Sequence, residues 1–300
     1  MYVLKGFAPQ YHDDGTVYDI WGYDGPEIHL CTIWKDIVPE SVIPAYSQGQ
    51  NDSDKADFEA NFKPFANKPI TTPVPQLKDG YVTTSGSTST RIMATTYNEQ
   101  TTNAQRSVVS SSANDTSAGT GARTIRITYY DQTLAGPFTE DITLNGTGAV
   151  NTAGSNICFI ERMEVLTVGA NGSNVGTLTL KSTTAGGGTD VGSIAVDDNE
   201  TNWCHHYIGS SKSMKLDNLF ATLRGVSGGV ITVRRSKPTV ANSPEITITP
   251  AIRVQPGMQV AQHFDVPVEV DGPARVSMFA RSDSASGTLD WNAGIGFYEA

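Results

Sequence analysis

The chain has 300 residues, which allows one to three domains with a substantial core. Hydrophobic residues make up 38% and charged residues 17%, and Gly, Ser, Thr and Asn supply much of the remainder. That surface composition is typical of proteins that pack into assemblies. The net charge is −10, and residues 1–70 contribute −6 of it, from 5 Lys against 11 Asp and Glu. This balance argues against a nucleic-acid partner, and the short Arg234-Arg235 pair does not alter it.

The cysteines and the apolar runs predict an intracellular site of synthesis. Cys31, Cys158 and Cys204 cannot form a disulfide framework, so we expect folding in a reducing cytosol. The start of the chain lacks the basic and apolar regions of a signal peptide. No apolar run approaches the 18 residues of a membrane span, so we expect no membrane partner.

Residues 1–70 are acidic and rich in aromatic side chains, with hairpin signals and one short predicted helix. The helix is expected within residues 51–62, where Ser53 is a suitable N-cap and Phe58 and Phe62 share one face. We interpret 1–70 as a β-rich docking region. Its candidate docking aromatics are Trp21, Tyr23, Trp34, Phe58 and Phe62.

Residues 71–122 are first rich in Pro and then in Ser and Thr, with 18 Ser or Thr and four charged residues over 83–122. The composition fits a flexible connector or an extended arm. Arg91-Ile92-Met93 and Val108-Val109 could instead form ordered strands, including strands against a neighbouring subunit. The sequence leaves both alternatives open.

Asp-Gly and Asn-Gly pairs punctuate runs of alternating apolar and polar residues at Asp14-Gly15, Asn145-Gly146, Asn171-Gly172 and Asp271-Gly272. Such pairs accept positive φ at low cost, as hairpin turns require. They predict an all-β protein built of antiparallel β-sandwich or jelly-roll domains.

Residues 123–300 form the predicted β-sandwich region, with a subdivision near 236–245. The alternation in this region recurs at intervals of roughly 10–15 residues, a rhythm typical of sandwiches. The predicted strands are 124–130, 138–144, 157–168, 176–181, 191–196, 214–223, 230–233, 246–249, 252–254, 260–270, 275–281 and 289–298.

From about residue 120 to 298 the chain resembles a family of tailed-bacteriophage virion proteins. The resemblance rests on Thr143–Thr147, on Ile160–Gly169 with Asn174–Leu178, and on Ile252–Gly257, Phe264–Val270, Val276–Arg281 and Gly294–Phe297. It implies a β-sandwich with a structural role in the particle, and it offers no catalytic residues to transfer. By analogy with such proteins it also implies a homotrimer.

Metal and cofactor sites are not expected. Cys204, His205 and His206 form the most metal-like cluster, but neighbouring residues on a strand point to opposite faces, so we interpret the cluster as ordinary packing. The acidic loop Asp197–Glu200 and the group Asp52, Asp54 and Asp57 lack EF-hand spacing. No phosphate-binding loop is present in the sequence.

Enzymatic activity is also not expected. A carboxylate pair for glycoside hydrolysis would come from Glu161, Glu164, Asp197, Asp198 and Glu200. Glu164 would share a strand face with Arg162, which favours an ion pair over a raised pKa. The five histidines show no arrangement typical of a serine triad.

Aromatic side chains could stack on sugars or form subunit contacts, and the candidates are Trp203, Tyr207, Trp291 and Tyr298. The sequence therefore favours a non-enzymatic virion protein, either a capsid decoration or a head fibre, that self-associates and docks through its N-terminal region onto other virion proteins. The alternative is a neck or tail component that binds host surface glycans. A third hypothesis, a depolymerase of host capsule, has less support.

Overall fold

The computed structural model describes residues 10–11, 17–18, 76–225, 227–241, 243–284 and 288–299. The chain divides into two compact units, 1–72 and 73–300. In the first unit, β1 (Gln10–Tyr11) pairs antiparallel with β2 (Val17–Tyr18), on either side of the predicted turn at Asp14-Gly15. The predicted helix and the docking aromatics Trp21, Tyr23, Trp34, Phe58 and Phe62 lie outside the described residues.

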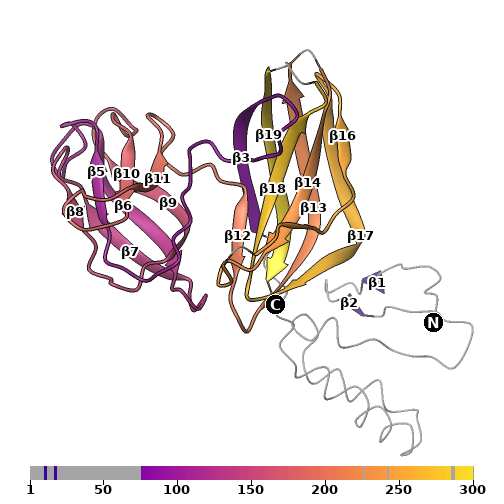
Figure 1. Cartoon of the computed structure of the whole chain (residues 1–300), viewed down its shortest axis with the longest axis horizontal. Coiled ribbons are helices and arrows are strands. Elements are labelled where there is room, and N and C mark those ends of the chain that lie inside the picture. The colour runs from indigo at the N-terminus through magenta and orange to yellow at the C-terminus, as the bar shows by residue number, and fades with distance from the viewer. Residues whose placement is uncertain are drawn as a thin grey trace, which may run out of the picture. The chain divides into compact units, whose positions relative to one another are not determined.

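The second unit contains two β-sandwiches, as expected for an all-β protein (Figure 1). The first consists of a three-stranded sheet in the order β7-β6-β9 and a four-stranded sheet in the order β11-β10-β5-β8. Its strands are β5 (Ser107–Ser110), β6 (Ala122–Tyr130), β7 (Phe138–Thr143), β8 (Val150–Asn151), β9 (Phe159–Val168), β10 (Leu178–Lys181) and β11 (Asp190–Ile194).

In the second sandwich, a six-stranded sheet packs against a four-stranded sheet. The first sheet runs β12-β18-β14-β15, with β16 paired to β14 and β4 paired to β18, and the second runs β17-β13-β19-β3. The strands are β3 (Gln76–Ser85), β4 (Thr90–Arg91), β12 (His205–Ile208), β13 (Ser213–Arg224), β14 (Gly229–Ser236), β15 (Ile246–Thr247), β16 (Ile252–Val254), β17 (Gln259–Asp271), β18 (Ala274–Ser282) and β19 (Thr288–Glu299).

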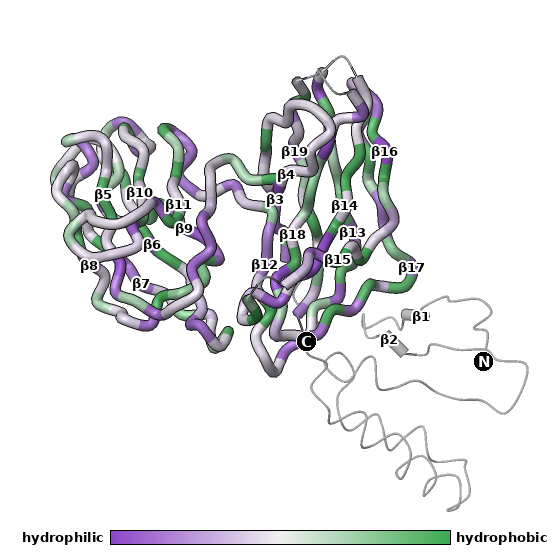
Figure 2. Tube along the Cα trace, in the orientation of Figure 1, coloured by the Kyte–Doolittle hydropathy of each residue, from purple (hydrophilic) through white to green (hydrophobic). Residues whose placement is uncertain are grey.

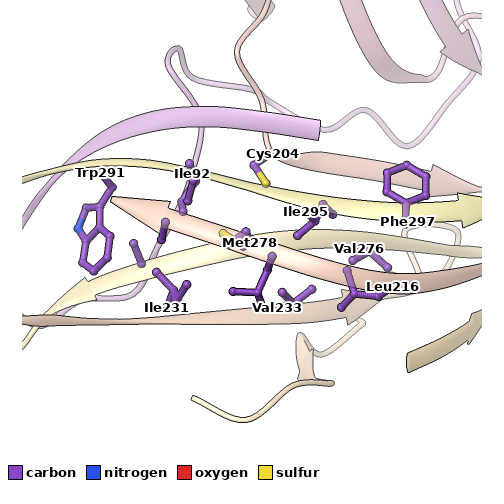
Figure 3. Packing of buried hydrophobic residues seen from close by; sticks show 14 of the residues in the cluster. Ile92, Cys204, Leu216, Ile231, Val233, Val276, Met278, Trp291, Ile295 and Phe297 are labelled. Carbon is purple, nitrogen blue, oxygen red and sulfur yellow. The ribbon is translucent and has the colours of Figure 1, made fainter. Parts of the chain in front are cut away.

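Each sandwich encloses its own core, because alternate residues of each strand point to the same face. Ile125, Ile127 and Ile160 belong to the core of the first sandwich. Trp291 and Met278 belong to the core of the second, which Figure 3 shows between the two sheets. Both hydrophobic and hydrophilic residues accordingly occur along the strands in Figure 2.

Residues 76–122 are built into both sandwiches. The strand β3 pairs with β19 over ten residues, and β4 pairs with β18. The strand β5 lies between β10 and β8 in the first sandwich. Of the two alternatives for this segment, the structure therefore has the ordered strands, and they pair within the chain.

Three of the predicted hairpin turns do not join paired strands. Asn145-Gly146, Asn171-Gly172 and Asp271-Gly272 each carry the chain from one sheet of a sandwich to the other. Gly146 and Gly172 do adopt positive φ, at 60° and 76°. The dipeptide therefore identifies a tight turn, whereas the apolar faces of the flanking strands decide which strands pair.

A single buried carboxylate ties the loops of the first sandwich together. Asp115 Oδ1 accepts hydrogen bonds from Ala122 N and Val175 N at 2.8 and 3.0 Å, and Oδ2 accepts from Ser110 Oγ and Gly176 N at 2.6 and 2.8 Å. The carbonyl of Asp115 accepts from Gly146 N at 2.7 Å. Asp115 is fully buried, so the four donors that bond to its carboxylate would lose this partner without it, whereas Gly146 N bonds to the main chain.

Replacing this carboxylate should destabilise the protein. We expect Asp115→Ala to lower the free energy of unfolding in urea by about 3–5 kcal/mol, because several buried donors lose their acceptor. The matched control is Asp141→Ala, which removes an exposed carboxylate that pairs with Arg126 and should cost less than about 1 kcal/mol. Equal losses for the two variants would contradict the assigned role of Asp115.

Candidate functional site

A cluster of charged side chains fixes the junction of the two sandwiches, and His206 on β12 is its centre. His206 Nδ1 lies 2.9 Å from Glu161 Oε1, on β9 of the first sandwich. His206 Nε2 lies 2.7 Å from Glu299 Oε1, at the end of β19 in the second sandwich. The side chain of His206 is 4% exposed and that of Glu161 is 5% exposed, so water contributes little to the solvation of either group.

Two lysines complete the cluster. Lys78 Nζ on β3 lies 2.7 Å from Glu161 Oε1, and Lys212 Nζ lies 3.3 Å from Glu299 Oε2. The second oxygen of Glu161 accepts a hydrogen bond from Tyr207 N at 2.9 Å. We call Glu161, His206, Glu299, Lys78 and Lys212 the junction cluster. Each carboxylate in it meets at least two partners, which is the condition under which a buried charge is tolerated.

The geometry determines the protonation of His206. Both ring nitrogens face carboxylate oxygens, which only accept hydrogen bonds, so both nitrogens must carry hydrogen. Burial alone would lower the pKa of His206, but Glu161 and the hydrogen bonds to Glu161 and Glu299 outweigh burial and raise it. Burial likewise acts to raise the pKa of Glu161, yet Lys78 and His206 hold it well below its usual range. The hydrogen bond from His206 is the main cause of the lowered pKa of Glu299.

A second polar chain crosses the junction beside this cluster. Ile160 N donates to Tyr97 Oη at 3.0 Å, the Tyr97 and Tyr207 hydroxyls are 2.9 Å apart, and Tyr207 Oη donates to Glu99 at 2.7 Å. Because Tyr207 donates to Glu99, Tyr97 is the donor between the two hydroxyls. Glu99 in turn pairs with the buried Arg275.

Arg275 connects this chain to the sheet of the second sandwich. Its guanidinium also pairs with Glu245 at 2.5 Å, and Arg91 reaches the same Glu245 oxygen at 2.8 Å. Several buried polar atoms on this face of β12, β14 and β18 have no hydrogen-bond partner among the described residues. They include Ser236 Oγ, Ser277 Oγ, Arg275 Nε and His205 Nδ1. Register places Ser277 opposite both His205 and Arg234, and Arg275 opposite Ser236, so these groups form one continuous polar patch.

The members of the metal-like cluster have separate roles, since His206 belongs to the junction cluster and His205 and Cys204 are packed side chains. His205 Nε2 lies 3.0 Å from the Ile160 carbonyl, and burial lowers the pKa of His205 to about 3, so its ring is neutral. Cys204 is buried in the core of the second sandwich. Within the described ranges no three His, Cys, Asp or Glu side chains are grouped so as to hold a metal ion.

Each candidate hydrolytic carboxylate has a partner within the chain. Glu161 belongs to the junction cluster, and Arg162 pairs with Glu164 and lies 3.8 Å from Glu200. Asp197 accepts from Ser173 Oγ at 2.6 Å, and Asp198 accepts from Tyr81 Oη at 2.7 Å. Glu164 and Glu200 thus share Arg162, and each of the other three is engaged with a donor or cation of its own.

Three of the four candidate sugar-binding aromatics are core residues. Trp203, Tyr207 and Trp291 are each at most 2% exposed, and their polar atoms are satisfied internally, for example Trp203 Nε1 by Thr95 and Trp291 Nε1 by Thr84. Their rings present no face to a ligand in this structure. Tyr298 alone among the four is partly exposed. Alanine variants of Trp203 or Trp291 would report on stability rather than on glycan binding.

Five charged residues of the junction were not identified from the sequence, namely Lys78, Glu99, Lys212, Arg275 and Glu299. One signal was available for Arg275, which interrupts the apolar run Ala274 to Ala280 on β18. Arg and Glu are almost never fully buried unless they are paired, so such an interruption indicates an ion pair. The partner could not be read from the sequence, because it lies far away along the chain.

Comparisons with known proteins provide little further information. No protein-family model matches the chain, and no curated protein sequence matches it. Among solved structures, the chain is similar to the infectious bursal disease virus Gx strain, with 5% identity, 76% of this chain and 72% of that chain covered, and a TM-score of 0.25. The Gt strain has 8% identity, with 76% of this chain and 72% of that chain covered and a TM-score of 0.22. A mutant VP2 protein of that virus, in derived T=1 particles, has 8% identity, with 76% of this chain and 74% of that chain covered and a TM-score of 0.19.

Similarities at these TM-scores are too weak to support an inference about shared fold or function. The all-β assignment rests on the strands of the chain itself. A search of the described residues for helices long and apolar enough to span a membrane found none.

The junction cluster should make stability depend on pH. A pKa raised in the folded state means that the contribution of His206 is fully present below its unfolded pKa of about 6.5 and is lost as pH rises through the folded pKa. We therefore expect the difference in unfolding free energy between wild type and His206→Gln to shrink between about pH 6 and pH 9. Urea unfolding across that range measures it.

The matched control is His263→Gln. His263 lies 3.5 Å from Asp217, but its side chain is 65% exposed, so its replacement should change stability little at any pH. A wild-type minus His206→Gln difference that stays constant from pH 6 to pH 9 would show that His206 is not held as an imidazolium.

Proposed function

We propose that this chain is a non-enzymatic structural component of a tailed-phage virion. The observation that carries the proposal is the junction cluster, in which buried charges from the two sandwiches pair with one another. Glu161 and the His205-His206 pair, the residues with the strongest sequence indication of chemistry, are all engaged in that role or in core packing. The family resemblance over residues 120–298 supports the same conclusion.

Within the virion, we propose a place on the capsid surface, as a decoration or head-fibre protein. The acidic, aromatic region 1–70 would dock onto other virion proteins, and the sandwiches would self-associate, with a homotrimer as the proposed state. Ser and Thr dominate much of the polar surface, for example Thr83, Ser85 and Thr88, which offers few charges to a reactive ligand. The protein would be made in the host cytoplasm before assembly.

The alternative, a neck or tail component that binds host glycans, has less support. Burial of Trp203, Tyr207 and Trp291 removes three of the four side chains that suggested sugar stacking. A depolymerase has still less support, because every candidate carboxylate is engaged with a donor or a cation of the chain.

The experiment that tests the proposal is labelling of the source particle with gold-tagged antibody against residues 123–300. We expect label spread over the capsid surface in electron micrographs. Label confined to the neck or tail would favour the glycan-binding alternative, and absence of label from every particle would contradict a virion role. An antibody against the major capsid protein serves as the positive control.

A further inference from the structure

One side of the second sandwich has no covering strand among the described residues. Within the described part of the chain, the strand β17 is the end strand of its sheet and pairs only with β13, while β16 pairs only with β14. Residues 255–258 link β16 directly to β17, so both strands lie along one side of the sandwich (Figure 1). We call β15, β16 and β17 the open side. The 13 residues of β17 present an unpaired row of backbone groups there, which is a template for pairing with another chain.

The core of the second sandwich is incompletely covered along the open side. Six partly buried apolar residues pack against this core, and five of them come from or beside the open side: Ile248, Ile252, Val260, Phe264 and Val268. Three further apolar side chains on or beside it are exposed to solvent: Ile246 at 49%, Met258 at 53% and Val266 at 81%. Apolar surface gathered beside a free strand edge is typical of an interaction site.

Val266 owes its exposure to a bulge in β17. Leu216 of β13 pairs with Val268, and Asn218 pairs with His263, so one β13 residue lies opposite four residues of β17, 264–267. The bulge turns Val266 outward, and Pro267 within it has no N–H to offer a partner strand. Regular pairing is therefore limited to the flanking stretches 259–263 and 268–271. A partner must accommodate Val266 between them.

The charges of the open side indicate the partner. The strand β17 carries exposed Asp265, Glu269 and Asp271 and no Lys or Arg, which disfavours nucleic acid or an anionic membrane. Arg253 on the neighbouring β16 is 65% exposed, although it also lies 3.4 Å from Asp283. The open side thus carries both signs, and a second copy could offer its Arg253 to the carboxylates of the first. The stretch 259–263 has no carboxylate, so two copies of it can pair without like charges opposite each other.

We propose that the open side is the contact surface between copies of this chain, with Val266 buried at its centre. This inference rests on the proposed structural function and specifies which face self-associates. The apolar residues of the open side supply the buried area, the β17 edges supply backbone pairing, and Arg253 meets the β17 carboxylates of the neighbouring copy.

The test is the mass of the full-length protein by light scattering after size-exclusion chromatography, over a series of concentrations. Wild type should give a mass above that of the monomer: a contact of β17 with β17 gives a dimer, and a contact of β17 with β16 of the next copy gives the proposed trimer. Val266→Lys should weaken association at least about tenfold and shift the protein toward its 32.0 kDa monomer, because the lysine would place a charge in the centre of the contact. Val196→Lys is the matched control, since Val196 is also an exposed valine, at 48%, but lies in the first sandwich. Its mass should match wild type.

A charge exchange gives an independent measurement. Arg253→Glu should weaken association, and Glu269→Arg in the same chain should restore it, whereas a purely structural effect of either change would not be rescued by the other. Unfolding midpoints equal to wild type show that the variants remain folded.

Two results would overturn the proposal. One is an unchanged mass for Val266→Lys. The other is a wild-type monomer at every concentration. If amide exchange of β17 then becomes faster on deletion of residues 1–75, the N-terminal region is what covers the open side. Neither result bears on gold labelling of the particle, so failure of this inference can be distinguished from failure of the virion role.

Discussion

The arrangement of the two sandwiches depends on one buried imidazolium held between two carboxylates. His206 lies on the four-residue strand β12, which contributes to both cores. Tyr207 packs in the first sandwich and Ile208 in the second. Glu161 approaches from one sandwich and Glu299 from the other. Such a cluster is stable only when it is complete, because removal of one member leaves an uncompensated charge in a poorly solvated place. The charges therefore restrict how the sandwiches can meet, because an orientation that separated Glu161 from His206 would leave both buried charges without this partner.

Sequence and structure agree best where the signal is local. Alternation located strands such as β6, β13 and β19 to within two residues of their ends, because one face of each is buried in a core. Strand pairing could be predicted less well from the sequence, since three of the four Asx-Gly turns join strands of different sheets. The junction cluster was inaccessible, since His206 is 45 residues from Glu161 and 93 from Glu299 along the chain. Glu161 was noticed only as a candidate hydrolytic carboxylate, and nothing local to it indicates a histidine and a lysine as its partners.

Asp115 gives a physical reason for two motifs on which the family resemblance rests. Gly146 of the Thr143–Thr147 motif donates its N–H to the Asp115 carbonyl, and Gly176 of the Asn174–Leu178 motif donates to the carboxylate. A side chain at Gly121 could not be accommodated, because its Cβ would lie 2.1 Å from Asp115 Oδ1. These short, glycine-containing motifs are thus positions where backbone approaches one buried acceptor closely. They describe how loops of the first sandwich are held, and they carry information about fold rather than about chemistry.

The two edges of the sheet β17-β13-β19-β3 differ in how the chain treats them. At the β3 edge, Tyr81 donates to Asp198, the Lys78 carbonyl accepts from Cys204 Sγ at 3.4 Å, and Lys78 joins the junction cluster. Contacts within the chain thus protect this edge. At the β17 edge, protection takes another form, namely a bulge, Pro267 and three carboxylates, which restrict pairing without preventing it. An edge that combines those restraints with an exposed valine and a nearby arginine discriminates among partners, since an arbitrary strand would meet the bulge and the negative charges. A partner whose surface accommodates the bulge and carries a basic group avoids both the steric and the electrostatic penalty, and another copy of the same surface has these features.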